Sequence, residues 1–192
     1  ATATYLIFPG DANPSLQLDL QTPLNNSTYS KYIPVGGRAT DDISVARVNV
    51  TVKNNATNQY LAANGYFVLK TNFRSSTGYG EKFLWGTWGA WGTKDGQDVM
   101  AGVDYAIAHY PIDRMRVATM GHSYGGFMTN WLITQYPDRF AAAIPGAGIV
   151  NWVSDYGTAD IARTKETEFC GTPWDPKARE IMIRQSPLTY AD

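Results

Sequence analysis

The pattern Gly121-x-Ser123-x-Gly125 constrains this chain more than any other. It lies between a short apolar run that ends at Met120 and a segment with helical spacing. A serine in this strand–turn–helix context is a nucleophile elbow. The turn is tight and strained, so the residues flanking the serine need very small side chains, which glycine provides. We therefore expect the Ser123 hydroxyl to stand clear of a sheet edge, with a helix N-terminus directed at the same point.

Strand-like and helix-like segments alternate around this motif. Asp95 is expected to cap the first long helix, and Pro137 to end the helix that follows the elbow. The sequence predicts strands at 66–69, 114–120 and 141–144, helices at 95–109, from the elbow to Pro137 and at 176–185, and a long connection at 151–176. Such alternation indicates an α/β fold with a parallel sheet covered on both faces. The run at 66–69 is typical of a buried parallel strand.

Residues 1–57 differ in character and are expected to form a β-rich N-terminal segment, separate from an α/β domain at 58–192. They are rich in Asn, Thr and Ser, with strands expected at 5–8, 16–20 and 45–52 and a turn at Gly36-Gly37. Four Asn-x-Ser/Thr sequons fall here, at Asn25, Asn26, Asn49 and Asn55. They indicate either a glycosylated secreted surface or chance in an Asn- and Thr-rich segment, and chance is favoured because the pattern is short. A cytoplasmic and a secreted location both stay open.

Composition excludes several kinds of partner. The net charge is -1 and no basic block occurs, so neither nucleic acid nor an anionic membrane is expected as the main partner. The longest apolar stretch, Ala141–Val150, is too short to span a bilayer. One cysteine, Cys170, and two histidines provide too few ligands for a structural zinc site. No metal and no other cofactor is expected.

Three tryptophans, Trp85, Trp88 and Trp91, lie close together in a glycine-rich stretch. They could form a stacking platform for sugars or bases. Packing of a loop on the domain is the favoured interpretation, because tryptophan usually serves cores and interfaces.

Ser123 needs partners before it can act as a nucleophile, because a free serine hydroxyl is weak without a base. The backbone N–H of Tyr124 is the expected first donor of an oxyanion hole. Gly36-Gly37 is the upstream pair whose amides could provide a second donor. A plain turn explains the same pair and is favoured.

The expected base is missing from the sequence, because no histidine follows Ser123. His122 fills the variable position of the elbow, and His109 at a helix end is expected to act as a C-terminal cap. Lys165 is a conceivable substitute base with no specific support. Three carboxylates follow the elbow in a region with no histidine to orient: Asp155, Asp160 and Asp175.

Four further stretches carry recognisable motifs in a fixed order: Tyr60–Tyr66, Asn72–Gly80, Asp98–Tyr105, and Glu168–Trp174 with Ser186–Leu188. Together with Gly121–Trp131 they resemble the catalytic domain of the prolyl oligopeptidase family of serine peptidases, especially its acylaminoacyl-peptidase-like branch. The resemblance covers about residues 58–192. It is specific because five motifs keep their order.

The resemblance implies an α/β-hydrolase-type fold, with a mostly parallel sheet and helices on both faces, truncated before the part that bears the acid and the histidine. It implies Ser123 as nucleophile, Tyr124 N–H in the oxyanion hole, and an elbow shaped by Gly121, Gly125 and Gly126. Family members usually carry a β-propeller before this domain. Two departures stand out. Residues 1–57 do not match the usual His-Gly-Gly-Pro loop, and Ser75 stands where the family generally has glycine.

The expected function is that of a serine hydrolase, most simply a peptidase that cleaves peptide or acyl-peptide bonds through an acyl-enzyme on Ser123. The triad Asp and His would come from chain beyond Asp192 or from a second polypeptide. Two alternatives remain open. One is a carboxylesterase on the same fold, and the other is a non-catalytic binding or structural module derived from a hydrolase.

Overall fold

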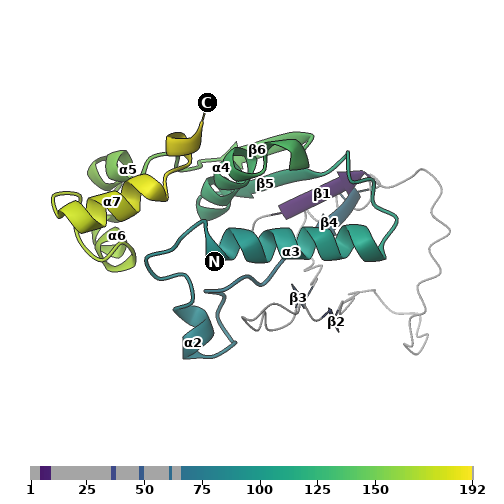
Figure 1. Ribbon diagram of the computed structural model, residues 1–192, viewed down its shortest axis with the longest axis horizontal. Coiled ribbons are helices and arrows are strands. Elements are labelled where there is room, and N and C mark those ends of the chain that lie inside the picture. The colour runs from purple at the N-terminus through teal and green to yellow at the C-terminus, as the bar shows by residue number, and fades with distance from the viewer. Residues whose placement is uncertain (1–4, 10–35, 38–47, 50–60, 62–65, 192) are drawn as a thin grey trace.

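The computed structural model describes residues 5–9, 36–37, 48–49, 61 and 66–191 (Figure 1). The central sheet has the strand order β4-β1-β5-β6. Its strands are β1 (Tyr5–Pro9), β4 (Tyr66–Leu69), β5 (Ala118–His122) and β6 (Ala142–Gly146). The predicted α/β class with parallel strands and helices is confirmed, as are strands close to the predicted positions in all four places.

The sheet is mixed rather than wholly parallel. β1 pairs antiparallel with both β4 and β5, whereas β5 and β6 are parallel. β4, β5 and β6 therefore run in one direction, and β1 runs against them. The prediction that β4 is a strand is confirmed. Its predicted parallel pairing is wrong, because the neighbour it bonds is β1, with Ile7 opposite Val68.

A second, two-stranded sheet pairs β2 (Gly36–Gly37) with β3 (Val48–Asn49). The turn predicted at Gly36-Gly37 is wrong, because this pair forms a short strand. β3 falls within the strand predicted at 45–52, and it contains one of the sequon asparagines. The other three sequons and the strand at 16–20 lie outside the described residues. The boundary between 57 and 58 stays a prediction, although β1 belongs to the same sheet as β4 and β5.

Two helices pack most closely on the strands, α3 (Lys94–His109) and α4 (Tyr124–Gln135). In Figure 1 both lie in front of the strands. They share one hydrophobic core with Leu69 and Val117, formed by Val99, Met100, Val103, Ala106, Phe127, Met128, Trp131 and Leu132. Both helices thus contribute apolar side chains to a single core. Helices over the opposite face of the sheet stay a prediction.

The predicted stop and cap residues of these helices agree with the structure in two cases and differ in one. α4 ends before Pro137, which begins the 3-10 turn η1 (Pro137–Arg139), as predicted. His109 Nδ1 lies 2.8 Å from the carbonyl oxygen of Tyr105, so its predicted role at the end of α3 is confirmed. The predicted N-cap is wrong: Thr93 occupies that position, and Asp95 lies inside the first turn with its carboxyl group fully buried.

The connection predicted at 151–176 is wrong, because it contains α5 (Trp152–Thr158) and α6 (Ala162–Glu168). Asn151 caps α5 through its side-chain oxygen, which accepts hydrogen bonds from the amides of Val153 and Ser154. Each helix has only seven residues, which is too short for an apolar stripe to repeat.

The predicted last helix is confirmed as α7 (Pro176–Arg184), followed by the 3-10 turn η2 (Pro187–Tyr190). α5, α6 and α7 lie together beside the sheet, and the short α2 (Glu81–Leu84) lies below α3 in Figure 1. Within the described residues, no helix combines the length and apolar character needed to cross a membrane.

Candidate functional site

Ser123 occupies the sharp turn between β5 and α4. Its backbone angles are φ 58° and ψ -118°, a conformation that costs energy for any residue with a side chain. Its N–H donates to the Gly146 carbonyl at 3.0 Å, and its own carbonyl accepts from the Phe127 amide at 2.9 Å. The turn is therefore held from both sides. The Ser123 residue remains exposed to solvent.

Glycines are required around this turn because backbone packs against backbone. A Cβ atom on Gly121 would lie 2.5 Å from the carbonyl carbon of Gly125. One on Gly126 would lie 2.3 Å from the carbonyl oxygen of Gly146. Both distances are far inside van der Waals contact, so any larger residue would push β5, β6 and α4 apart.

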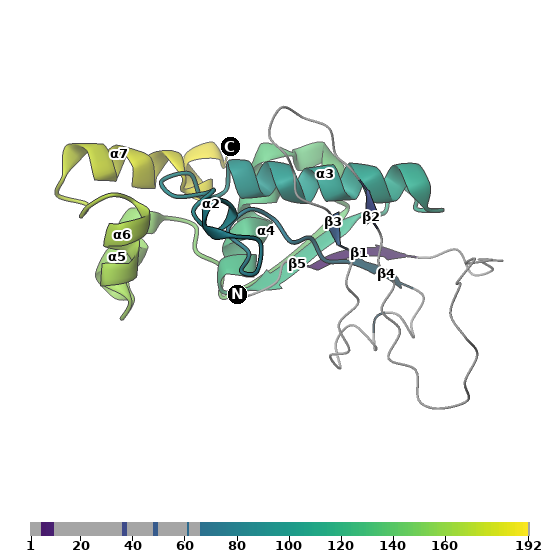
Figure 2. The same ribbon diagram turned by 90° about the horizontal axis from the view of Figure 1, so that it is seen from below.

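Tyr124 is the first residue of α4, so its N–H has no carbonyl one turn earlier in the helix to bind. That amide directly follows Ser123. Gly36 and Gly37 lie in β2, away from the first turn of α4 in both views (Figures 1 and 2). The structure thus brings Ser123 and Tyr124 together at the elbow. The role of the glycine pair as a second donor stays a prediction.

Most of the other residues weighed from the sequence have structural partners. Lys165 is buried and forms an ion pair with Asp155, at 2.5 Å between Nζ and Oδ2. Asp175 caps α7 by accepting from the amides of Lys177 and Ala178. Asp160 is exposed. Lys165 is therefore engaged between α5 and α6 rather than held ready as a base.

Next to the elbow, the structure contains a hydrogen-bonded pair, Tyr124 and Asp95, that the sequence did not predict. The hydroxyl of Tyr124 donates a hydrogen bond to Oδ2 of Asp95. Oδ1 of Asp95 accepts from the Gly96 amide at 3.1 Å. Asp95 is 0% exposed, and this burial raises the pKa of its carboxyl group from 3.8 to about 6, although the bond from Tyr124 partly offsets the effect. Burial and the neighbouring Asp95 raise the pKa of Tyr124 well above its ordinary value.

Aromatic rings surround the Tyr124 side chain. Phe73 stacks on it with ring centroids 6.2 Å apart, and Trp91 meets it edge-on at 5.0 Å. Trp91 also contacts Trp152 and Phe169. The favoured packing interpretation of the tryptophan cluster is confirmed for Trp91. Trp88 is 56% exposed, but its Nε1 donates a hydrogen bond to the Thr167 carbonyl of α6, so it also attaches the loop to the domain. Trp85 is 50% exposed.

Glu168, at the end of α6, is a second carboxyl group near Tyr124. Burial raises its pKa, and a hydrogen bond from Trp91 acts in the opposite direction. Its charge also contributes to the raised pKa of Tyr124. Two carboxyl groups therefore influence the phenol of the residue that follows Ser123.

The loop before α2 is fixed to α3 by a buried ion pair. The Arg74 guanidinium donates to both carboxylate oxygens of Asp98, at 2.7 and 2.8 Å, and its backbone N–H donates to the same group. Ser75 follows with a φ of 79°. That left-handed value explains why glycine suits this position. Here the Ser75 hydroxyl bonds the hydroxyl of Thr87, and its amide donates to the Phe83 carbonyl at 2.9 Å.

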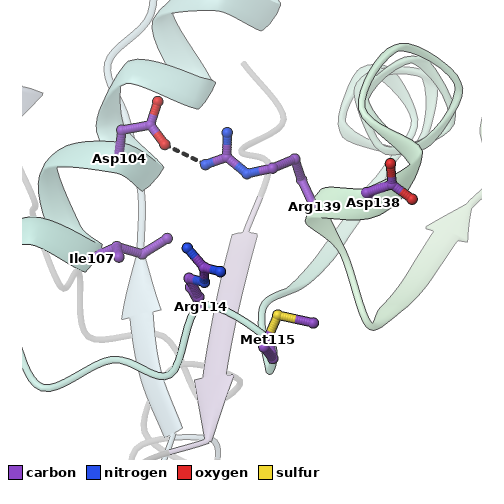
Figure 3. A pocket seen from close by; sticks show the side chains of 6 residues that line it. All are labelled: Asp104, Ile107, Arg114, Met115, Asp138 and Arg139. Atoms are coloured by element: carbon purple, nitrogen blue, oxygen red, sulfur yellow. Dashed lines mark hydrogen bonds and ion pairs between the residues drawn. The ribbon is translucent and has the colours of Figure 1, made fainter.

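A cavity of about 470 Å³ lies elsewhere on the molecule (Figure 3). It is lined by Asp104 and Ile107 of α3, by Arg114 and Met115, and by Asp138 and Arg139 of η1. Arg139 is directed at Asp104, with which it forms an ion pair. Arg114 and Met115 precede β5, so this cavity lies at the amino end of that strand. Ser123 follows the carboxyl end, where α/β sheets bind their ligands.

Among the described side chains, no group of three His, Cys, Asp or Glu residues is placed to hold a metal ion.

The sequence resembles proteins of known family. A model of the prolyl oligopeptidase family matches residues 52–192. An uncharacterized peptidase of Bacillus subtilis, YuxL, is 49% identical over 139 residues, which is 69% of this chain and 20% of that protein. The mouse acylamino-acid-releasing enzyme is 36% identical over 132 residues, which is 66% of this chain and 18% of the enzyme.

Solved structures of acylaminoacyl peptidases also resemble this chain. The acylaminoacyl peptidase of Pyrococcus horikoshii superposes with a TM-score of 0.65 at 34% identity, over 71% of this chain and 22% of that one. A structure of an acylaminoacyl peptidase in complex with Z-Gly-Gly-Phe-chloromethyl ketone superposes with a TM-score of 0.59 at 34% identity, over 68% of this chain and 21% of that one. The chain thus spans about a fifth of the length of these relatives.

Proposed function

Because the chain belongs to the prolyl oligopeptidase family of serine peptidases, we propose that Ser123 is the nucleophile of a peptidase acting on peptide or acyl-peptide bonds. The observation that carries the proposal is the strained, solvent-exposed position of Ser123 at the start of α4. Strain of this kind is costly, and it is typical of sites where a side chain must be presented to a substrate.

The proposed reaction is acyl transfer. Ser123 Oγ bonds the carbonyl carbon while a base takes its proton, and the carbonyl oxygen becomes an oxyanion. The Tyr124 N–H donates to that oxyanion, and the N-terminal end of α4 adds its positive dipole. The amine then leaves with a proton, and water releases the acyl group from the serine.

The general base for Ser123 is expected to be a histidine that follows the serine in the chain. No histidine follows Ser123. We infer that the acid and histidine come from chain beyond Asp192 or from a second polypeptide. The 192 residues alone are then expected to turn over very little substrate, because loss of the triad base leaves only binding and oxyanion contributions.

Labelling with a fluorophosphonate probe tests the assignment of the nucleophile. The longest natural polypeptide that contains these residues is expected to be labelled stoichiometrically, at Ser123 and not in the Ser123→Ala variant. Absence of labelling in the folded protein would favour a non-catalytic module. Comparing an N-acylated peptide with a simple ester as substrates then separates the peptidase from a carboxylesterase, since the elbow serves both.

A substrate-turnover assay of the 192-residue chain tests the missing base. Turnover that disappears in Ser123→Ala would contradict the inference that the base comes from elsewhere.

A further inference from the structure

We propose that Asp95 is a positioning residue for this reaction: it holds Tyr124, and through Tyr124 the peptide group that follows Ser123, in the geometry that receives the oxyanion. The inference rests on the proposed function. Asp95 is not expected to touch the substrate. It acts through Tyr124.

The first argument is connectivity. Asp95 lies in the first turn of α3, and Tyr124 is the first residue of α4, 29 residues later. The bond between them ties the N-terminal ends of the two helices together. Tyr124 carries the expected oxyanion donor at its backbone and the anchored hydroxyl at the far end of its side chain. Fixing that hydroxyl restricts rotation of the whole residue.

The second argument is the choice of a carboxyl group. Asp95 is fully buried, so ionising it costs desolvation free energy that a neutral side chain would avoid. Phe73 and Trp91 already pack on the Tyr124 ring, so bulk alone could fill this space. A costly buried acid next to a candidate nucleophile is typical of functional sites rather than of packing.

The titratable and charged groups around Asp95 come from α3, α4, α6 and the loop after β4. On its own helix it faces Asp98, whose charge is paired with Arg74 from the loop after β4. From α4 it faces the phenol of Tyr124, which in turn senses Glu168 at the end of α6. As the pH falls through about 6 and Asp95 gains its proton, the hydrogen bond between Tyr124 and Asp95, which we call the anchor, should therefore change from charge-assisted to neutral.

The anchor itself is tested without any catalysis. In protein labelled with ¹³C at the tyrosine Cζ atoms, the Tyr124 signal is identified by its loss in Tyr124→Phe. We expect that signal to titrate near pH 6 in the wild type and to lose this transition in Asp95→Asn. Asp104→Asn changes an exposed acid of the same helix and should leave the titration unchanged.

The positioning role is tested by the rate of fluorophosphonate labelling at Ser123 in the longest natural polypeptide that contains the chain. Asp95→Ala and Tyr124→Phe should each slow labelling about 10- to 100-fold, since small misplacements of a catalytic group have effects of this size. The double variant should be no slower than the slower single variant, because both remove one link. Asp104→Ala should label at the wild-type rate.

The outcomes separate the two proposals. A folded Asp95→Ala protein that labels at the wild-type rate, or a double variant whose losses multiply, overturns the positioning role and leaves the nucleophile intact. A folded wild-type protein that is never labelled at Ser123 overturns the proposed function and this role with it. If Asp95→Ala does not fold, Asp95→Asn takes its place. The ratio of the wild-type labelling rate to the Asp95→Asn labelling rate should change through pH 6, where Asp95 ionises, because the ionisation of the proposed histidine affects both proteins and cancels in the ratio. A ratio that stays constant from pH 5 to 8 overturns the role.

Discussion

The backbone at Ser123 combines a positive φ with a residue that has a side chain, and this predicts a conflict between stability and chemistry. Ser123→Gly should stabilise the fold by about 1 kcal/mol, because glycine adopts this conformation with little strain. The same change removes the proposed nucleophile. Thermal unfolding of the two proteins measures the difference.

A matched glycine substitution provides the control for this effect. Ser154 is exposed within α5 and has helical surroundings, so Ser154→Gly should destabilise by roughly 0.5–1 kcal/mol. A loss of stability in Ser123→Gly would show that the turn is not strained.

The raised pKa of Asp95 makes the free energy of unfolding depend on pH. At pH 4 and below, the carboxyl group is largely protonated in the folded and the unfolded chain, so it contributes little difference. As the pH rises from 4 to 6, the unfolded chain loses this proton first, because the folded-state pKa is about 6 rather than 3.8. Stability therefore falls through this window, by up to about 3 kcal/mol.

Asp95→Asn should remove that loss. Its stability relative to the wild type should rise between pH 4 and 7, as measured by urea unfolding at each pH. Asp104→Asn should show no comparable rise. A constant difference between Asp95→Asn and the wild type across this range would contradict the raised pKa.

The contrast between these two residues shows what sequence reasoning can reach. The elbow around Ser123 could be predicted because its glycines are neighbours in the chain and the turn needs them there. The bond between Asp95 and Tyr124 spans 29 positions and depends on how two helices meet. The one available signal was that Asp95 lies four residues before Val99, on the buried stripe of α3 rather than at a cap.

At the scale of elements, the ion pair between Arg74 and Asp98 joins a loop to α3. Arg74→Met should destabilise by about 3–5 kcal/mol, because Asp98 would be left buried without a partner. Adding Asp98→Leu should recover much of the loss, since no buried charge then remains. Urea unfolding of the single and double variants checks both expectations.

The exposed pair between Arg139 and Asp104 is the natural comparison. Arg139→Met should cost no more than about 1 kcal/mol, because water screens that pair. Equal losses from Arg74→Met and Arg139→Met would mean that burial does not strengthen the first pair.

The helices that could be predicted are the longer ones, in which an apolar pattern repeats over several turns or a proline marks the end. α3, α4 and α7 show apolar stripes or clear stop signals, and their predicted ranges agree with the structure to within a few residues. α5 and α6 are two turns each, so Asn151 as a cap was the main local clue to α5. The insertion of β1 between β4 and β5 joins residues about sixty and more positions apart, and no local pattern encodes it.

Across the whole molecule, the alternation of strands and helices was enough to give the α/β class, but it does not describe the edge of the sheet. β6 lies at the end of the strand order of the described sheet. Ile144 on this strand is 60% exposed, and Leu188 of η2 is 55% exposed. An apolar edge strand of this kind is a template for association with another chain.

We therefore expect the isolated 192-residue chain to self-associate through β6. Ile144→Lys places a charge on that edge, and it should raise the concentration at which the chain stays monomeric in sedimentation velocity. Ile161→Lys is the matched change, because Ile161 is 57% exposed but lies at the start of α6, outside the sheet. It should have a smaller effect. An equal gain from both variants would mean that general surface hydrophobicity, and not the strand edge, drives association.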